Sequence, residues 1–278
     1  EKLGYSISKM ILEGPENDLQ LTKNTQPAIL TVSYSIFKLL KEEFNFDFNN
    51  TKYFAGHSLG EYSALVCANA LEFSDAIYLV NQRGKAMQEA VPVGKGNMIA
   101  LLGRPISEIT KLINHLKDNL NICEIANDNA DGQIIVSGDA KSIKYFQAVL
   151  KEKKIKSIPL KVSAPFHCSM MKSAAELMKE KIFKVEFKEP AFDIINNVTA
   201  QTEKKTENIK ELLVKQIFST VKWRESILKM SEFGISNFIE IGPGKVLSGM
   251  VKRTIKNANC FSINSIADIN FLINELKK

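Results

Sequence analysis

Apolar positions recur at helical spacing through the N-terminal third of the chain. Residues 22–44 are predicted to form a helix, one face of which is marked after Pro27 by Ile29, Val32, Ile36, Leu39 and Leu40. Residues 75–90 repeat the spacing, with Ser74 as the expected N-cap. Between these helices, a short apolar run at 52–55 predicts a strand, and the Ala- and Leu-rich run at 61–69 predicts a further helix.

From residue 93 to residue 162, the predicted elements are short and alternate in kind. Strands are expected at 98–103, 121–127, 132–138 and 155–160, and helices at 106–119 and 140–153. This βαββαβ order is typical of a ferredoxin-like unit. We therefore expect residues 93–162 to form a small inserted subdomain, and residues 1–92 and 163–278 to form the large domain around it.

The large domain continues with alternating elements. A turn at 163–170 leads to a predicted helix that ends near residue 181. Strands are then expected at 191–198 and 236–242, and helices at 209–218 and 225–233. Strands that alternate with helices favour a mostly parallel sheet that is covered on both faces. The predicted fold class is therefore α/β.

Composition and cysteine usage place the chain among globular proteins. It has 278 residues, of which 45% are hydrophobic and 24% charged. No run approaches the roughly 18 apolar residues of a membrane-spanning helix, and residues 1–17 lack the apolar stretch of a signal peptide. The four cysteines are far apart, without zinc or redox spacing, which predicts reduced thiols, a cytoplasmic-type compartment and no metal site.

The net charge of +6 bears on possible partners. Basic segments such as 151–156 lack interleaved aromatic residues, which argues against binding of nucleic acid. A basic surface suits an acidic partner protein or an anionic ligand. Charge alone does not distinguish between these two.

The stretch FAGHSLGEYSAL, at 54–65, places a serine between two glycines, after a predicted strand and before a predicted helix. This Gly-x-Ser-x-Gly arrangement is typical of the nucleophile elbow of a hydrolase-like core, in which the hydroxyl of Ser58 stands clear of the backbone. The small glycines are expected to let strand and helix approach closely. The alternative is a plain glycine-rich turn with an N-capping serine.

A serine nucleophile needs a base, and the chain has three histidines. His57 adjoins the serine and is expected to have a structural role, whereas His115 lies on the polar side of a predicted helix and is expected to face solvent. His167 lies at a probable strand end, where residues meet across the crevice of an α/β sheet. We therefore favour His167 as the base.

Other polar residues have less definite roles. Arg83 lies in the helix after the elbow, and its spacing does not decide between the surface and the site. Four asparagines are expected to line the crevice, without assigned chemistry: Asn127, Asn129, Asn196 and Asn197.

Four stretches together resemble the successive signatures of the malonyl-CoA:acyl-carrier-protein transacylase family of type II fatty acid synthesis. They are GHSLGEYSALVCANAL, QRGKAMQEAVPVGKGNM, APFHCSMM and EIGPGKVLSGM, in family order. The resemblance extends from about Thr25 to about residue 254, and the family also carries a βαββαβ insertion. It implies malonyl-CoA and acyl carrier protein as partners, no cofactor, a monomer, and a cytoplasmic or organellar setting for type II synthesis.

The resemblance also implies roles for individual residues. Ser58 becomes O-malonylated, His167 moves the proton, and transfer is ping-pong. The backbone N–H of Leu59 supplies an oxyanion donor, and the backbone carbonyl of Gln216 orients the histidine in place of a triad aspartate.

Three more residues are implied in substrate binding. Arg83 pairs with the free malonyl carboxylate and so selects malonyl over acetyl. Phe166 resembles the malonyl-selective form of the related polyketide acyltransferase motif, which disfavours a methylmalonyl donor, and Met87 completes the set.

One departure from the family concerns the start of the chain. The family begins with a strand and a Gly-Gln-Gly-Ser-Gln turn whose glutamine gives a second oxyanion N–H, and this chain starts beyond that point. Loss of one such donor typically lowers the rate on the order of 10²–10³-fold. Either the sequence is a fragment, or the protein lacks this strand. In the second case the expectation is an impaired site and an exposed sheet edge.

Two alternatives remain open from the sequence. One is a serine thioesterase or esterase, although its histidine is expected late in the chain, and a long segment follows His167. The other is a catalytically impaired homologue that binds the carrier protein.

Overall fold

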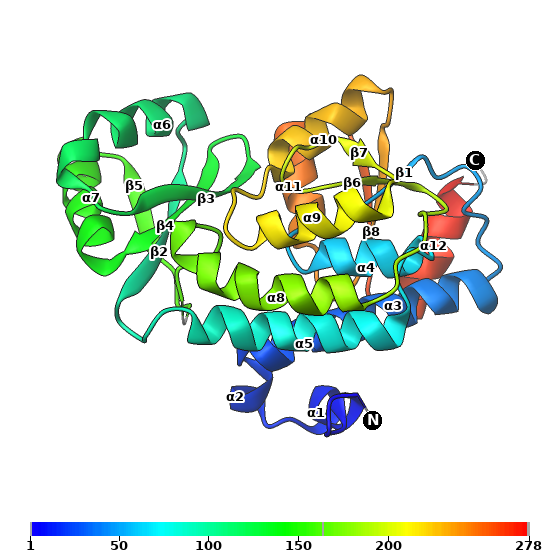
Figure 1. The fold of residues 1–278 in the computed structure, drawn as a ribbon. Helices are drawn as coiled ribbons and strands as arrows, with labels where there is room; N and C mark the ends of the chain where they lie inside the picture. Colours follow the sequence, from blue (N-terminus) through cyan, green and yellow to red (C-terminus); the bar gives the residue numbers. More distant parts are fainter. Residues whose placement is uncertain (1, 163, 277–278) are drawn as a thin grey trace.

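The N-terminal third is mostly helical, with one short strand, in the computed structural model, which describes residues 2–162 and 164–276 (Figure 1). The long helices α3 (Thr22–Glu42) and α5 (Phe73–Glu89) lie side by side. They come close at Gly84, where a Cβ would lie 2.5 Å from Cα of Lys23. Strand β1 (Tyr53–Ala55) leads through a tight turn into α4 (Gly60–Cys67). Two short helices precede α3: α1 (Ile7–Glu13) and α2 (Glu16–Leu19).

The strands of the large part form two sheets among the described residues. Strand β6 (Asp193–Ile195) lies between β1, which is parallel to it, and β7 (Thr202–Glu203), which is antiparallel. Strands β8 (Asn237–Ile241) and β9 (Asn259–Ile263) form a separate parallel pair. The prediction of one mostly parallel sheet is therefore wrong in this respect. Apolar side chains of β1, β6 and β8 share one hydrophobic cluster, so packing rather than backbone hydrogen bonding joins the two sheets.

Five helices surround these strands and complete the large part. They are α8 (Lys172–Lys184), α9 (Thr206–Gln216), α10 (Trp223–Glu232), α11 (Val246–Thr254) and α12 (Ile266–Leu276). None of the described helices is both long and apolar enough to cross a membrane.

Residues 96–159 form a separate four-stranded sheet at one end of the molecule (Figure 1). Its strands are β2 (Gly96–Leu102), β3 (Cys123–Ala130), β4 (Gln133–Asp139) and β5 (Lys156–Pro159). Their order across the sheet is β3-β4-β2-β5, and every neighbouring pair is antiparallel. Helices α6 (Ile106–His115) and α7 (Ala140–Glu152) supply apolar side chains that complete its own core, together with the leucines that flank the short 3₁₀ turn η1 (Lys117–Asn119).

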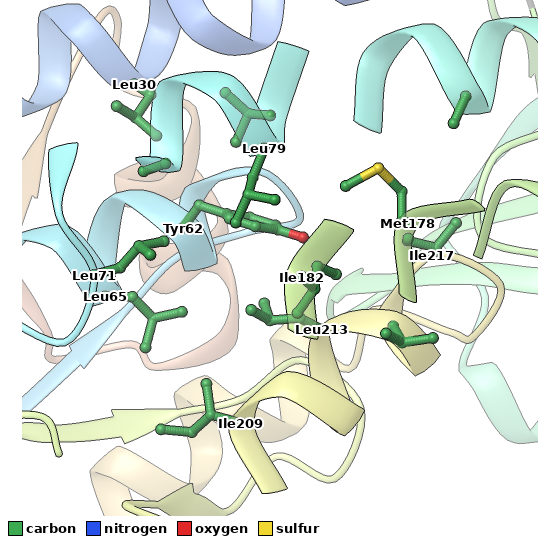
Figure 2. Close-up of a cluster of buried hydrophobic side chains, with 14 of the residues drawn as sticks. Leu30, Tyr62, Leu65, Leu71, Leu79, Met178, Ile182, Ile209, Leu213 and Ile217 are labelled. Atoms are coloured by element: carbon green, nitrogen blue, oxygen red, sulfur yellow. The ribbon is translucent and has the colours of Figure 1, made fainter. Parts of the chain in front are cut away.

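The largest core of the molecule is built from α3, α4, α5, α8 and α9 (Figure 2). Leu65 of α4, Met178 of α8 and Leu213 of α9 are fully buried there. Helix α4 is buried from Glu61 to Cys67, which its mostly small and apolar side chains permit. Because α4 begins two residues after Ser58, this packing fixes the turn that carries the serine.

Several predicted boundaries are corrected. Helix α5 begins at Phe73, and its N-cap is Glu72, without a side-chain capping bond, instead of Ser74. Strand β3 extends beyond residue 127 to Ala130, because Asp128 and Ala130 continue the pairing with β4. The short elements α1, α2 and β7 and the C-terminal β9 and α12 were not predicted.

Candidate active site

Ser58 occupies the turn between β1 and α4 with a backbone φ of 53°, a left-handed conformation that an L-residue rarely adopts. A Cβ at Gly56 would overlap the carbonyl group of Gly60, so strand and helix approach as closely as predicted. The prediction is wrong for Gly60 itself, because a Cβ there would meet nothing within 4 Å. Only the first glycine of the motif is required by packing.

The hydroxyl of Ser58 lies against the imidazole of His167, which comes two residues before the short 3₁₀ turn η2 (Ser169–Met171) that precedes α8. Oγ of Ser58 and Nε2 of His167 are 2.8 Å apart, and Nδ1 of the same ring is 2.8 Å from the backbone carbonyl oxygen of Gln216. A carbonyl oxygen can only accept, so the proton is on Nδ1. Nε2 is therefore free to accept the proton of the Ser58 hydroxyl.

Arg83 reaches the same serine oxygen from α5. Its Nη2 donates to Oγ of Ser58 at 3.0 Å and to Oε1 of Gln216 at 2.8 Å, and its Nη1 donates to Oε1 of Gln26 at 2.7 Å. The side chain is only 1% exposed, and all three acceptors are neutral. Nε has no hydrogen-bond partner within the described ranges. A buried guanidinium that contacts only neutral oxygens is well suited to take an anion.

A polar layer beneath the turn holds its backbone. Oδ1 of Asn197 accepts from the N–H of Ser58 at 2.7 Å, while Nδ2 of Asn197 donates to the carbonyl of Gly56 at 2.8 Å. Oε2 of Glu61 accepts from the N–H of Asn197 at 3.1 Å and from Nε2 of Gln216 at 2.7 Å. Asn197, two residues after the end of β6, thereby holds the backbone on both sides of His57.

Burial sets the protonation of two groups in the site. The pKa of His167 falls from 6.5 to about 3, because the ring is buried and because Arg83 is positively charged. Burial raises the pKa of Glu61 from 4.5 to about 7, against hydrogen bonds from Gln216 and Asn197 and the attraction of Arg83. The imidazole is therefore neutral at pH 7.

The remaining predicted residues occupy various positions. Leu59 is the N-cap of α4, and no acceptor for its N–H is found among the residues described. Phe166 is half-buried between the large core and the small sheet. Met87, one turn after Arg83, is buried in the apolar core, so its predicted contact with substrate stays a prediction.

The other two histidines and the asparagines named from the sequence lie outside the contacts of the Ser58 hydroxyl. Nε2 of His57 lies 2.8 Å from Oδ1 of Asn129, and the ring packs edge-on against Trp223. His115 is exposed. Asn196 bonds within its own turn, to Thr199 and Gln201. Asn127 is buried in β3.

Three contributors were missed by the sequence analysis. The sequence pattern assigns Glu61 only to the start of a helix, although an acidic residue three positions after the serine is a usable signal. Gln26 precedes Pro27 in a predicted helix and carries no signal of its own. Asn197 was placed in the crevice without its role in the turn.

Neither of two surface hollows includes Ser58. One, of about 380 Å³, is lined mainly by residues 45–49 with Phe37 and Phe192, and the other, of about 330 Å³, lies between α1, α3 and α5. Within residues 2–162 and 164–276, no group of three or more His, Cys, Asp or Glu is arranged to hold a metal ion. The predicted absence of a metal stays a prediction.

Comparisons with known proteins agree on one family. The model of the acyl transferase domain matches residues 1–270. A malonyl CoA-acyl carrier protein transacylase of Bacillus subtilis is 42% identical, covering 100% of this chain and 87% of its own length. The crystal structure of an acyl-carrier-protein S-malonyltransferase from Bartonella henselae superposes with a TM-score of 0.94 at 37% identity, over 100% of this chain and 88% of that one.

A third similar protein was solved with its partner. It is a malonyl-transacylase in complex with a type II PKS acyl-carrier protein, and it superposes with a TM-score of 0.93 at 35% identity. The match covers 99% of this chain and 88% of that one.

Proposed function

This chain belongs to the acyl transferase family, among the malonyl-CoA:acyl-carrier-protein transacylases, and from that premise we propose how its site works. It is an acyltransferase of fatty acid biosynthesis, which moves the malonyl group from malonyl-CoA to the phosphopantetheine thiol of acyl carrier protein. The observation that carries the mechanism is that one oxygen, Oγ of Ser58, contacts both Nε2 of His167 and Nη2 of Arg83. The hydrolase and impaired-homologue alternatives are not favoured.

The first half-reaction forms the acyl-enzyme. Oγ of Ser58 attacks the thioester carbonyl of malonyl-CoA, and its proton passes to Nε2 of His167. The new O–C bond forms, the C–S bond breaks, and His167 returns the proton to the departing thiolate of coenzyme A. The backbone carbonyl of Gln216 holds the imidazolium through Nδ1.

The second half-reaction reverses these steps with another thiol. The carrier-protein thiol gives its proton to His167 and attacks the serine ester. The new S–C bond forms, the Oγ–C bond breaks, and the proton returns to Ser58. Acyl carrier protein is thus the second substrate, and the kinetics are ping-pong.

The backbone N–H of Leu59 stabilises the oxyanion that forms on the thioester carbonyl. The N–H of Ser58 is already bonded to Asn197, whereas no acceptor among the described residues competes for the N–H of Leu59. Leu59 also lies at the N-terminus of α4, whose dipole favours negative charge. These features support the predicted oxyanion donor.

Arg83 selects the acyl group. A malonyl carboxylate brings an anion to a guanidinium whose hydrogen-bond acceptors are otherwise neutral oxygens, and two parallel N–H bonds match its geometry. An acetyl group leaves the buried charge without an anion, which disfavours it. The bound carboxylate also offsets the positive charge that depresses the pKa of His167, so the substrate strengthens its own base.

The proposal also covers the roles of two apolar residues, the domain division and the setting of the protein. Phe166 and Met87 shape the acyl-binding side of the site. The small unit, 93–162, is a ferredoxin-like insertion in a hydrolase-like domain formed by 1–92 and 163–278, and its antiparallel β3-β4-β2-β5 order supports this. We place the protein, without a cofactor and as a monomer, in the cytoplasm or in an organelle that runs type II synthesis.

Intact-mass spectrometry after brief mixing with malonyl-CoA or acetyl-CoA tests the mechanism. We expect a malonyl adduct on the wild-type protein, little acetyl adduct, and neither on Ser58→Ala. A malonyl adduct that persists in Ser58→Ala would assign the nucleophile elsewhere. Equal malonyl and acetyl labelling of the wild type would contradict the selective role of Arg83.

A further inference from the structure

Glu61 is a buried carboxyl group that neither half-reaction uses. It lies on the first turn of α4, three residues after Ser58, and is 2% exposed. Its Oε2 accepts from Nε2 of Gln216 at 2.7 Å. Burial of a carboxyl group costs free energy unless hydrogen bonds compensate for the lost water, so its partners next to the nucleophile indicate what it does.

The side-chain amide of Gln216 connects Glu61 to Arg83. Its Oε1 accepts from Nη2 of Arg83 at 2.8 Å, and its Nε2 donates to Glu61 and, at 3.0 Å, to the backbone carbonyl of Ser58. Gln216 itself is completely buried. One amide group thus joins the guanidinium on α5 to the carboxylate on α4.

Both ends of this connection select the same amide orientation. If the amide were reversed, Nε2 would face the N–H groups of Arg83, and Oε1 would face the oxygens of Glu61 and Ser58. Donor would then meet donor and acceptor would meet acceptor, with no solvent to compensate. Arg83 holds one end, and Glu61 is the main acceptor at the other.

We propose that Glu61 is a positioning residue for malonyl selection: by accepting from Nε2, it keeps Oε1 of Gln216 facing Arg83 and so holds the guanidinium fork beside Ser58. The inference rests on the proposed function of Arg83 and deepens it. Without an acceptor at position 61, Nε2 of Gln216 keeps the carbonyl of Ser58 and, at 3.4 Å, Oδ1 of Asn197, but loses its shortest bond. The amide is then held less firmly, and so is the direction of the guanidinium that it faces.

A plainer role for Glu61 predicts something different. Oε2 also accepts from the backbone N–H of Asn197, which in turn holds the N–H of Ser58. If Glu61 served only the elbow through Asn197, its loss would slow transfer of every acyl group alike. If Glu61 positions Arg83, its loss should slow transfer of the malonyl group and leave transfer of the acetyl group nearly unchanged.

Three variants separate these roles. Glu61→Gln can place an oxygen where Oε2 lies and keep both bonds, without the charge. Glu61→Ala removes the acceptor, and Glu61→Asp keeps a carboxylate but withdraws it by one methylene. If the alanine variant does not fold, which a circular dichroism melt shows, the aspartate variant carries the test.

The measurement is kcat/KM of each variant for malonyl-CoA and for acetyl-CoA. We expect Glu61→Ala and Glu61→Asp to lower the malonyl value about tenfold or more, as for loss of a hydrogen bond to a charged group, while the acetyl value changes less than about threefold. Glu61→Gln should keep the wild-type ratio of the two values. Equal losses on both substrates, or a glutamine variant as unselective as alanine, would overturn the proposal.

A readout that does not require turnover separates this proposal from the proposed function. The side-chain amide resonance of Gln216, followed by NMR in ¹⁵N-labelled protein, should shift in Glu61→Ala and stay close to wild type in Glu61→Gln. An unchanged resonance in the alanine variant would overturn the positioning role, even if the enzyme is active. If the variants show the expected resonance shifts but the wild-type protein transfers no malonyl group, the result would instead contradict the proposed function.

Discussion

Arg83 donates directly to the hydroxyl oxygen of Ser58, with Nη2 of the arginine 3.0 Å from Oγ of the serine. The same oxygen lies 2.8 Å from Nε2 of His167, so a buried positive charge adjoins the proton to be moved. The charge stabilises the serine alkoxide but weakens the imidazole as a base. A substrate that brings its own carboxylate to Arg83 relieves the second effect.

Removal of this charge should raise the pKa of His167. Burial and then Arg83 together lower it to about 3, so Arg83→Ala should move it upward, towards the usual 6.5. NMR titration of ¹³C-labelled histidine checks the shift, with the exposed ring of His115 as an internal reference signal. A His167 titration that is the same in both proteins would show that burial alone sets its pKa.

Substitution of Arg83 should also remove the preference for malonyl. Arg83→Lys keeps the charge but loses the two-pronged donor, and Arg83→Ala loses both. We expect kcat/KM for malonyl-CoA to fall about 100-fold or more in the alanine variant, since a buried charged contact is lost, with little loss for acetyl-CoA. Steady-state kinetics with both thioesters measures this. Retained selectivity in Arg83→Lys would mean that charge, rather than geometry, selects the acyl group.

The two glycines of the elbow should respond differently to alanine. At Gly56 a Cβ would overlap the carbonyl of Gly60, and only a backbone shift relieves this, so Gly56→Ala should destabilise the fold by about 3 kcal/mol or more. Gly60→Ala is the matched control, because the space there is open and α4 starts at that residue. It should change stability by less than about 1 kcal/mol. Urea unfolding of both variants compares them, and similar losses would contradict this explanation of the motif.

The stability of the protein should carry a pH-dependent contribution from Glu61. Its folded-state pKa is raised from 4.5 to about 7 by burial, with Arg83 on α5 and the neighbouring Tyr62 as the ionisable groups that face it. A raised pKa means that the folded state holds the proton more tightly. The stabilisation is therefore fully present below pH 4.5 and is lost as the pH rises through about 7.

Glu61→Gln lacks this titration. Between pH 4.5 and about 7, the free energy of unfolding of the variant should rise relative to wild type by on the order of 3 kcal/mol. Urea unfolding at a series of pH values measures the difference. A difference that is constant across this range would show that Glu61 titrates normally.

Local signals along the chain were sufficient for several features. The Gly-His-Ser-Leu-Gly run after an apolar strand marked the turn of Ser58, and helical periodicity located α3, α5 and α7 within a few residues. The alternation of short elements after residue 93 predicted the order of strands and helices in the small sheet. Each of these features depends on residues close in sequence, so spacing and turn chemistry are enough to reveal it.

Only the tertiary structure decided which distant polar groups meet. Gln26, Glu61 and Gln216 lie on three different helices, and no periodicity marks a polar residue that is buried for its hydrogen bonds. The division of the strands into two sheets and the tolerance at Gly60 likewise depend on how elements far apart in the sequence pack together. The sequence by itself determined the serine turn and the elements on either side of it. The arginine, the amide and the carboxylate around that serine come together only through long-range contacts, which a pattern of neighbouring residues does not encode.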